Sequence, residues 1–265
     1  MVSKLPNSKW SKTMPLFESS HRLHCVYLAF LSRSEGEIWV DNARAPNAAL
    51  LLHPFMAVIA GDPGCRDAKK LLAKIHLPKI IAPTDSAWDA PIKELFGEKA
   101  IQAPRTKFAE EPPNSRKVRA ALKNIAAGYS IQSIDRKNIG KVLETFKDGA
   151  GIIGLFWDKK TFLRESFGYV AVDKNGNLVS LSIMGTPLHN GMFEIHTETH
   201  PDHRRKGLAT ATNAALITEA AKRKIIPLWD AANENSAKLA TRLGFRAAEN
   251  YNIFFYYVPE AQKSE

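Results

Sequence analysis

One stretch of the sequence, from Met192 to Lys224, constrains the fold more than any other. Residues 192–199 alternate as a half-buried strand does, and residues 208–224 have the spacing of a long amphipathic helix. The loop between them contains Pro201 and the run Arg204-Arg205-Lys206-Gly207-Leu208-Ala209. The first N–H groups of a helix have no acceptor within it, and the helix dipole adds partial positive charge there. The segment therefore predicts a phosphate-binding site at a strand-to-helix turn.

The rest of the C-terminal half predicts a sheet with flanking helices. Strands are expected at 129–134, 167–173, 178–184 and 225–229, and helices at 137–146 and 236–243. Asn175-Gly176 lies between two alternating runs, which is a strong signal for a hairpin. Gly244 follows the last helix and suits a left-handed C-terminal cap. The order indicates an α/β fold with a mixed, largely antiparallel sheet flanked by helices.

The N-terminal part predicts a smaller α/β domain. Strands are expected at 36–41, 48–52, 55–60 and 80–82, and helices at 67–75 and 90–95. Residues 103–119 contain three prolines, many charges and few apolar side chains, which is typical of a linker or exposed loop. We therefore expect two domains, at residues 1–115 and 116–265.

Composition excludes several classes of protein. With 45% hydrophobic and 24% charged residues the chain is expected to be globular, and no apolar run reaches the roughly 20 residues of a membrane span. The two cysteines, Cys25 and Cys65, lack metal-site spacing, so no metal is predicted. The first residues lack a secretory signal, and a cytoplasmic location is expected. The net charge of +10 leaves nucleic-acid binding as an unfavoured alternative, because no basic block with interleaved aromatics accompanies it.

Two segments carry a family resemblance. Arg204-x-x-Gly207-x-Ala209, between a strand and a long helix, resembles motif A of the GNAT N-acetyltransferases. Residues 233–245, from Asn233 to Leu243-Gly244-Phe245, are similar to the Asn-x-x-Ala/Ser-x-x-Leu-x-x-x-Leu-Gly-Phe signature of the same family. Further residues across the chain look like the two-domain bacterial GNAT group, in which a smaller α/β domain precedes the catalytic one.

The resemblance implies acetyl-CoA as cosubstrate. Its pyrophosphate is expected on the loop amides, and its pantetheine arm beside residues 197–199, as an added strand. This position requires the strand to separate from its neighbour at 225–229. The residues expected to contact the cofactor are Thr197, Glu198, Thr199, Arg204, Arg205, Lys206, Gly207, Leu208, Ala209, Thr210, Asn233 and Ser236.

Three residues of one strand face are candidates for the general base. An amine must lose a proton when it attacks the thioester, so a positioned base accelerates transfer. Glu194 is the first choice because a carboxylate near this point of the strand often serves as base in the family. Glu198 and His196 share its face and are the alternatives.

The general acid is left unassigned by the sequence. Many family members carry a Tyr that protonates the leaving thiolate at the position of Ala240. Either the thiolate leaves unaided or another hydroxyl serves, such as Tyr251, Tyr256 or Ser236.

The expected function is acetyl transfer from acetyl-CoA to a primary amine of a small molecule. A longer acyl donor, a protein amine, or a catalytically weak CoA-binding regulatory or sequestering protein remain alternatives. The N-terminal domain is expected to shape the acceptor side or to form a homodimer. No motif identifies the acceptor.

Overall fold

The computed structural model describes residues 1–20, 22–76 and 79–257. The chain divides into two compact units, residues 1–107 with the segment from Asn250 onward, and residues 108–249. The boundary therefore lies between Lys107 and Phe108 rather than near residue 115. The C-terminal segment groups with the first unit because its strand pairs there, with Phe254 opposite Ile81. Among the described residues, no helix has the length and apolar character needed to cross a bilayer.

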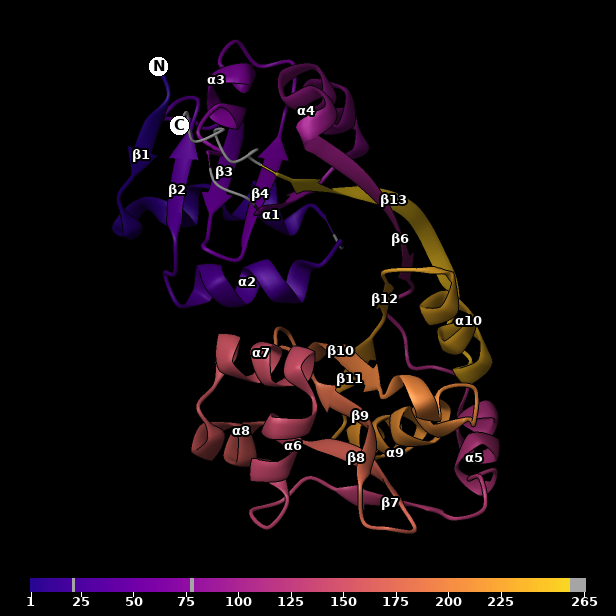
Figure 1. The fold of residues 1–265 in the computed structure, drawn as a ribbon. Helices are drawn as coiled ribbons and strands as arrows, with labels where there is room; N and C mark the ends of the chain where they lie inside the picture. The colour runs from indigo at the N-terminus through magenta and orange to yellow at the C-terminus, as the bar shows by residue number, and fades with distance from the viewer. Residues whose placement is uncertain (21, 77–78, 258–265) are drawn as a thin grey trace, which may run out of the picture. The chain divides into compact units, whose positions relative to one another are not determined.

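The first unit is built on one sheet. Its strands lie in the order β1 (Ser3–Leu5), β2 (Glu37–Val40), β3 (Ala48–Leu52), β4 (Met56–Gly61), β5 (Lys79–Pro83), β13 (Ala247–Tyr256) and β6 (Ala100–Phe108). Helices α3 (Ala68–Leu72) and α4 (Asp89–Phe96) cover one face, and α1 (Met14–Glu18) and α2 (His24–Ser32) lie on the other (Figure 1). Leu50, Ile59 and Trp88 are fully buried in the core on the α3 face. The short α/β unit expected from the sequence is confirmed.

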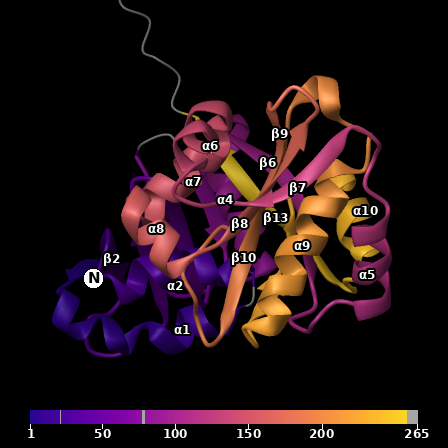
Figure 2. The same cartoon turned by 90° about the horizontal axis from the view of Figure 1, so that it is seen from below.

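The second unit contains a five-stranded sheet between two layers of helices. The strand order is β11 (Ile226–Leu228), β10 (Met192–Thr199), β9 (Leu178–Met184), β8 (Gly168–Asp173) and β7 (Tyr129–Ser133). Only the β10–β11 pair is parallel, and the other three pairs are antiparallel. Helices α5 (Ser115–Lys123), α9 (Leu208–Lys222) and α10 (Glu234–Leu243) lie on one side, and α6 (Ile139–Thr145), α7 (Lys147–Phe156) and α8 (Lys159–Glu165) on the other (Figure 2). The mixed, largely antiparallel sheet flanked by helices is confirmed.

Local signals placed several turns correctly. The β8–β9 hairpin turns at Gly176, whose φ is 81°, and α10 ends at Gly244, whose φ is 95°. Both values lie in the left-handed region that glycine adopts without a steric cost.

The prediction of a linker or exposed loop at residues 103–119 was wrong. β6 runs through Pro104 to Phe108, and α5 begins at Ser115, where the Asn114 side chain caps the helix by accepting from two backbone N–H groups. The middle of β6 is exposed or half-buried, most of α5 is exposed, and Val118 is the buried residue of α5. A polar, proline-containing strand and a largely exposed helix have the composition of a linker, which explains the error.

Helices α7 and α8 were not expected either. Gly149, Gly151 and Gly154 lie within α7, and glycine lowers helix propensity by about 1 kcal/mol relative to alanine. Packing of Ile153 and Phe156 against neighbouring residues overrides this cost. α8 carried a readable signal, because Asp158 caps it with bonds from the N–H groups of Lys160 and Thr161.

Candidate functional site

Strand β10 has an open edge over its C-terminal half. It pairs with β11 only at residues 192–194, and the last pair joins Glu194 to Leu228. From Ile195 to Thr199 it pairs with β9. In this antiparallel pair Gly185 donates to the Glu194 carbonyl and His200 donates to the Val179 carbonyl. Bonding alternates along an antiparallel strand, so the N–H and C=O groups of Ile195, Thr197 and Thr199 point away from β9, toward the open edge.

The edge is open because the chain after β11 changes partner. The Trp229 carbonyl accepts a hydrogen bond from Phe108 N at 3.0 Å, and β12 (Asp230–Ala231) continues beside β6. The Trp229 ring is buried against Phe245, with ring centroids 5.3 Å apart, and its Nε1 donates to Ser236 Oγ at 3.0 Å. The separation of β10 from β11 expected from the sequence is therefore present, and Trp229 belongs to the core.

On the α9 face of β10, threonine side chains join a buried polar network. Asn213 Nδ2 of α9 donates to Thr197 Oγ1 at 3.0 Å and to the Ala209 carbonyl at 2.8 Å. Ser182 Oγ of β9 lies 2.8 Å from Thr212 Oγ1 and 3.4 Å from Thr197 Oγ1. Ser182, Thr212 and Asn213 are fully buried. These three residues were not singled out from the sequence. For Thr212 and Asn213 the available signal was a polar residue on the buried face of an amphipathic helix.

The network connects the open edge to the start of α9, where the phosphate site was expected. Left-handed backbone at Arg205 (φ 61°) and Gly207 (φ 77°) turns the chain into the helix. Gly207 is the N-cap and Ala211 N is the first amide that bonds back to it, at 3.0 Å. The amides of residues 208–210 therefore have no acceptor within the helix, as an anion site requires.

Cationic side chains surround these amides. Arg204, Arg205 and Lys206 are exposed, and Arg204 Nε donates to the Thr199 carbonyl at 3.2 Å. Lys206 Nζ donates to Tyr129 Oη at 3.2 Å and to the Asp202 carbonyl at 3.1 Å. The loop is thus positioned by β7 and by the end of β10, and it offers amide donors together with positive charge.

The opposite face of β10 carries the candidate bases. Glu198 Oε2 accepts a hydrogen bond from Gly149 N, at the start of α7, at 3.1 Å. Burial raises the pKa of the Glu198 carboxyl, and the nearby Asp148 charge adds to the increase. Burial also lowers the pKa of His196, whose Nε2 is buried with no hydrogen-bond partner among the residues that the structure describes. His196 is therefore held in the neutral form, and Glu198 resists ionisation more than an exposed glutamate.

Glu194 lies at the point where β10 and β11 separate. It is the last residue of β10 that pairs with β11, its backbone N donates to Thr186 Oγ1 at 3.0 Å, and it is buried. Strand alternation places its side chain on the face of His196 and Glu198. The three candidate bases therefore share one face of β10. Glu194 lies where β11 still pairs with β10, Glu198 lies nearest the loop before α9, and His196 lies between them.

The second motif lies around the start of α10. Asn233 caps the helix, with its side chain accepting from Ser236 N at 3.0 Å. Ser236 Oγ accepts from Trp229, so its own proton is free to be donated elsewhere. Ala240 is fully buried in the cluster that contains Trp229 and Phe245, and it brings no hydroxyl to the site.

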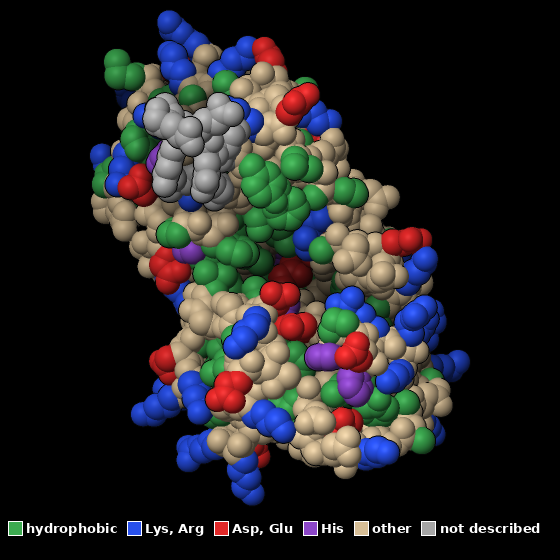
Figure 3. Space-filling view, in the orientation of Figure 1, with side chains coloured by type: hydrophobic (Ala, Val, Ile, Leu, Met, Phe, Trp, Pro, Cys, Tyr) green, Lys and Arg blue, Asp and Glu red, His purple; other side chains and the backbone are tan. Residues whose placement is uncertain are grey.

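On the face of the molecule in Figure 3 the positive charge is spread out. Figure 3 shows Lys and Arg side chains scattered over this face with Asp and Glu between them, without a continuous basic stripe. Cations concentrate locally at the loop before α9. Local charge at a helix start suits a small polyanion rather than an extended polymer.

Comparisons with known proteins agree with this arrangement. The family model of the GNAT acetyltransferases matches residues 14–254. An uncharacterised N-acetyltransferase of Bacillus subtilis, YdfB, is 22% identical over 266 residues, covering 96% of this chain and 98% of its own length.

Solved structures show the same fold. A GCN5-related N-acetyltransferase-like protein from Streptococcus suis superposes with a TM-score of 0.78 at 24% identity, covering 94% of this chain and 99% of its own. A GCN5-related N-acetyltransferase from Sphaerobacter thermophilus superposes with a TM-score of 0.66 at 11% identity, covering 96% of this chain and 94% of its own.

Proposed function

Because this chain belongs to the GNAT acetyltransferase family, we propose that it transfers an acetyl group from acetyl-CoA to a primary amine of a small molecule. The chain is an acyltransferase, and its fold is one that uses an acyl-CoA cosubstrate. The acetyl donor, the amine acceptor and the catalytic residues are the proposal. The observation that carries it is the open β10 edge leading to the free amides at the start of α9.

The cofactor is proposed to follow this edge. The pyrophosphate accepts hydrogen bonds from the amides of residues 205–210, with Arg204 and Lys206 beside it. The pantetheine arm then runs back along β10 and pairs with the outward backbone groups of Thr197 and Ile195, as an added strand does. The Thr197 and Thr199 side chains are engaged with Asn213 and Ser180, so these threonines contribute their backbone rather than their hydroxyls.

Glu194 is our proposed general base. The pantetheine arm enters from the loop before α9, so its thioester reaches the point where β10 and β11 begin to pair, and Glu194 lies at this point. Glu198 is nearer the loop and already accepts from Gly149 N. His196 lies between them and is held neutral, so it can take a proton as the alternative base.

The chemistry needs few further groups. A neutral amine attacks the thioester carbonyl, whose oxygen accepts a hydrogen bond from an N–H on the open edge, and its proton passes to Glu194 directly or through one water. When the tetrahedral intermediate collapses, the C–S bond breaks and CoA leaves as thiolate. Ala240 cannot protonate it, and of the three alternative hydroxyls only that of Ser236 lies in the unit that holds β10.

A thiol-release assay with acetyl-CoA and a panel of amines tests the proposal. Glu194→Gln should lower kcat by about 10²–10⁴-fold with CoA affinity unchanged, whereas Glu144→Gln on the exposed surface of α6 should leave both unchanged. Micromolar CoA binding without turnover of any amine would instead establish a binding protein. Turnover only with longer acyl-CoA donors would refute the acetyl donor but keep the site.

A further inference from the structure

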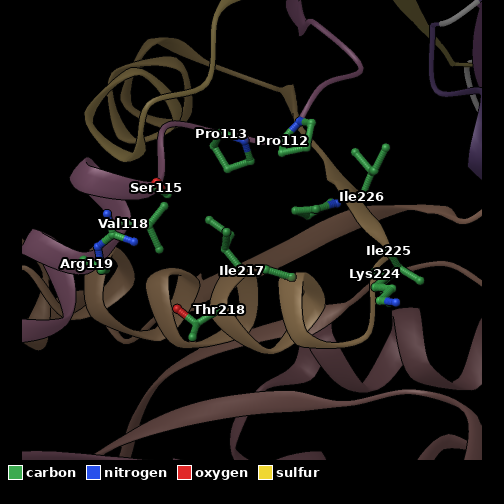
Figure 4. Close-up of a pocket in the computed structure, with 12 residues that line it drawn as sticks. Pro112, Pro113, Ser115, Val118, Arg119, Ile217, Thr218, Lys224, Ile225 and Ile226 are labelled. Atoms are coloured by element: carbon green, nitrogen blue, oxygen red, sulfur yellow. The ribbon is translucent and has the colours of Figure 1, made fainter.

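A cavity lies in the unit that holds β10, away from the loop before α9. Its volume is about 480 Å³, within the range of roughly 300–1,000 Å³ typical of ligand pockets. It is bounded by α5, by the C-terminal half of α9 and by the segment that leads into β11 (Figure 4). Ile217 lies nine residues after Leu208, so a rise of about 1.5 Å per residue places this wall roughly 14 Å along α9 from the loop.

The walls of the cavity are apolar. Val118 and Ile217 point toward each other between the two helices, and Pro112, Pro113 and Ile226 close another side (Figure 4). Thr218 also lines the cavity, but its hydroxyl donates to the Ala214 carbonyl of its own helix at 2.7 Å. The interior therefore favours a hydrocarbon chain over a polar metabolite.

Two cations lie at the rim. Arg119 on α5 and Lys224 after α9 both line the cavity and stand at opposite ends of it in Figure 4. Both residues are exposed, and over the described part of the chain no carboxylate forms an ion pair with either. An apolar cavity with unneutralised cations at its mouth is complementary to a chain that ends in an anion.

We propose that this cavity binds a medium-chain carboxylate, with the hydrocarbon between α5 and α9 and the carboxylate on Arg119 or Lys224. The site shares α9 with the acyl-CoA loop but uses none of the same residues. It is therefore independent of the proposed acetyl transfer.

Calorimetric titration of the full chain with dodecanoate, below the concentration at which it forms micelles, tests the proposal. Saturable binding with one ligand per chain is expected, and affinity should fall about fourfold for each methylene removed from the ligand. Dodecanol and dodecylammonium should bind at least tenfold more weakly, because neither offers an anion to the rim.

Matched variants locate the ligand. Ala221 is exposed and lines the cavity, so Ala221→Trp should fill it and weaken dodecanoate binding at least tenfold. Lys222→Trp, one residue along α9 and outside the cavity, should leave binding unchanged. Arg119→Gln combined with Lys224→Gln should weaken binding severalfold and remove its salt dependence, whereas Arg116→Gln on α5 should not.

Retained CoA binding in each variant shows that the second unit is folded. The proposal is overturned if dodecanoate does not saturate, if dodecanol binds equally well, or if Ala221→Trp binds like the parent. A dimer in sedimentation that Ala221→Trp abolishes, without dodecanoate binding, would assign the cavity to a second copy of the chain instead.

Discussion

Thr197→Val isolates the role of the buried polar network. Valine has nearly the shape of threonine, so the change removes one hydroxyl without opening a large cavity. Asn213 Nδ2 keeps its bond to the Ala209 carbonyl, and Ser182 keeps its contact with Thr212. Asn213 Oδ1, which lies 3.1 Å from the Thr197 hydroxyl, loses that partner in a fully buried position.

The magnitude follows from Asn213 Oδ1, because Asn213 Nδ2 and Ser182 Oγ also lose their contact with the Thr197 hydroxyl but each keeps another partner. A buried polar atom left without a partner costs about 1–3 kcal/mol, so the free energy of unfolding should fall by about 2 kcal/mol. For a chain of this size that corresponds to a decrease in Tm of about 4–8 °C. Denaturant titration and thermal unfolding, both followed by circular dichroism, measure the change.

CoA affinity should respond differently. Thr197 is proposed to meet the cofactor through its backbone, which valine preserves, so the Kd for CoA should change by less than about threefold. Thr241→Val is the control, because that exposed hydroxyl donates to the Ala237 carbonyl of its own helix and is not part of the buried network. Unchanged stability together with a tenfold loss of CoA affinity would refute the reasoning and would mean that the hydroxyl contacts the ligand.

Three further predictions concern the loop and the opposite strand face. Gly207→Ala should cost about 1 kcal/mol because of its left-handed backbone, and should weaken CoA binding about tenfold by displacing the amides that follow. Lys206→Met should weaken CoA binding about tenfold and reduce its salt dependence, since one cation near the phosphates is lost. The pKa of Glu198 is raised in the folded chain, so its stabilising contribution is complete below the unfolded pKa near 4.5 and is lost as pH rises through the folded value. Glu198→Gln, which stays neutral, should therefore gain stability relative to the parent as the pH rises above about 4.5, as measured by Tm.

Controls for these predictions come from the same chain. Gly176→Ala has the same backbone penalty at φ 81° in an exposed hairpin and should leave CoA binding unchanged. Lys222→Met should leave the salt dependence as it is. A Tm difference between Glu198→Gln and the parent that does not vary with pH would contradict the assigned ionisation, and a Gly207→Ala variant that binds CoA normally would contradict the role of the amides.

The sequence by itself determined the features that depend on a few neighbouring residues. Gly207 before a long helix, Gly176 in a hairpin and Gly244 after α10 each require a backbone conformation that glycine allows, and each has it in the structure. The alternation of residues 192–199 placed Glu194, His196 and Glu198 on one strand face. The family was readable for the same reason, because its motifs are contiguous.

Only the tertiary structure decided what depends on contacts between distant residues. β10 acquires its open edge because Trp229 pairs with Phe108, which lies far from it in sequence. Glu198 has its raised pKa because α7, a helix with three glycines, packs over it and buries its carboxyl, an effect that outweighs the hydrogen bond from the Gly149 amide. Local propensity acts over a few residues, whereas burial and strand exchange depend on the whole fold. For that reason the loop proposed to hold the phosphate was visible in the sequence. The separation of β10 from β11 was expected only from the family resemblance, and the pairing that causes it became visible in the structure.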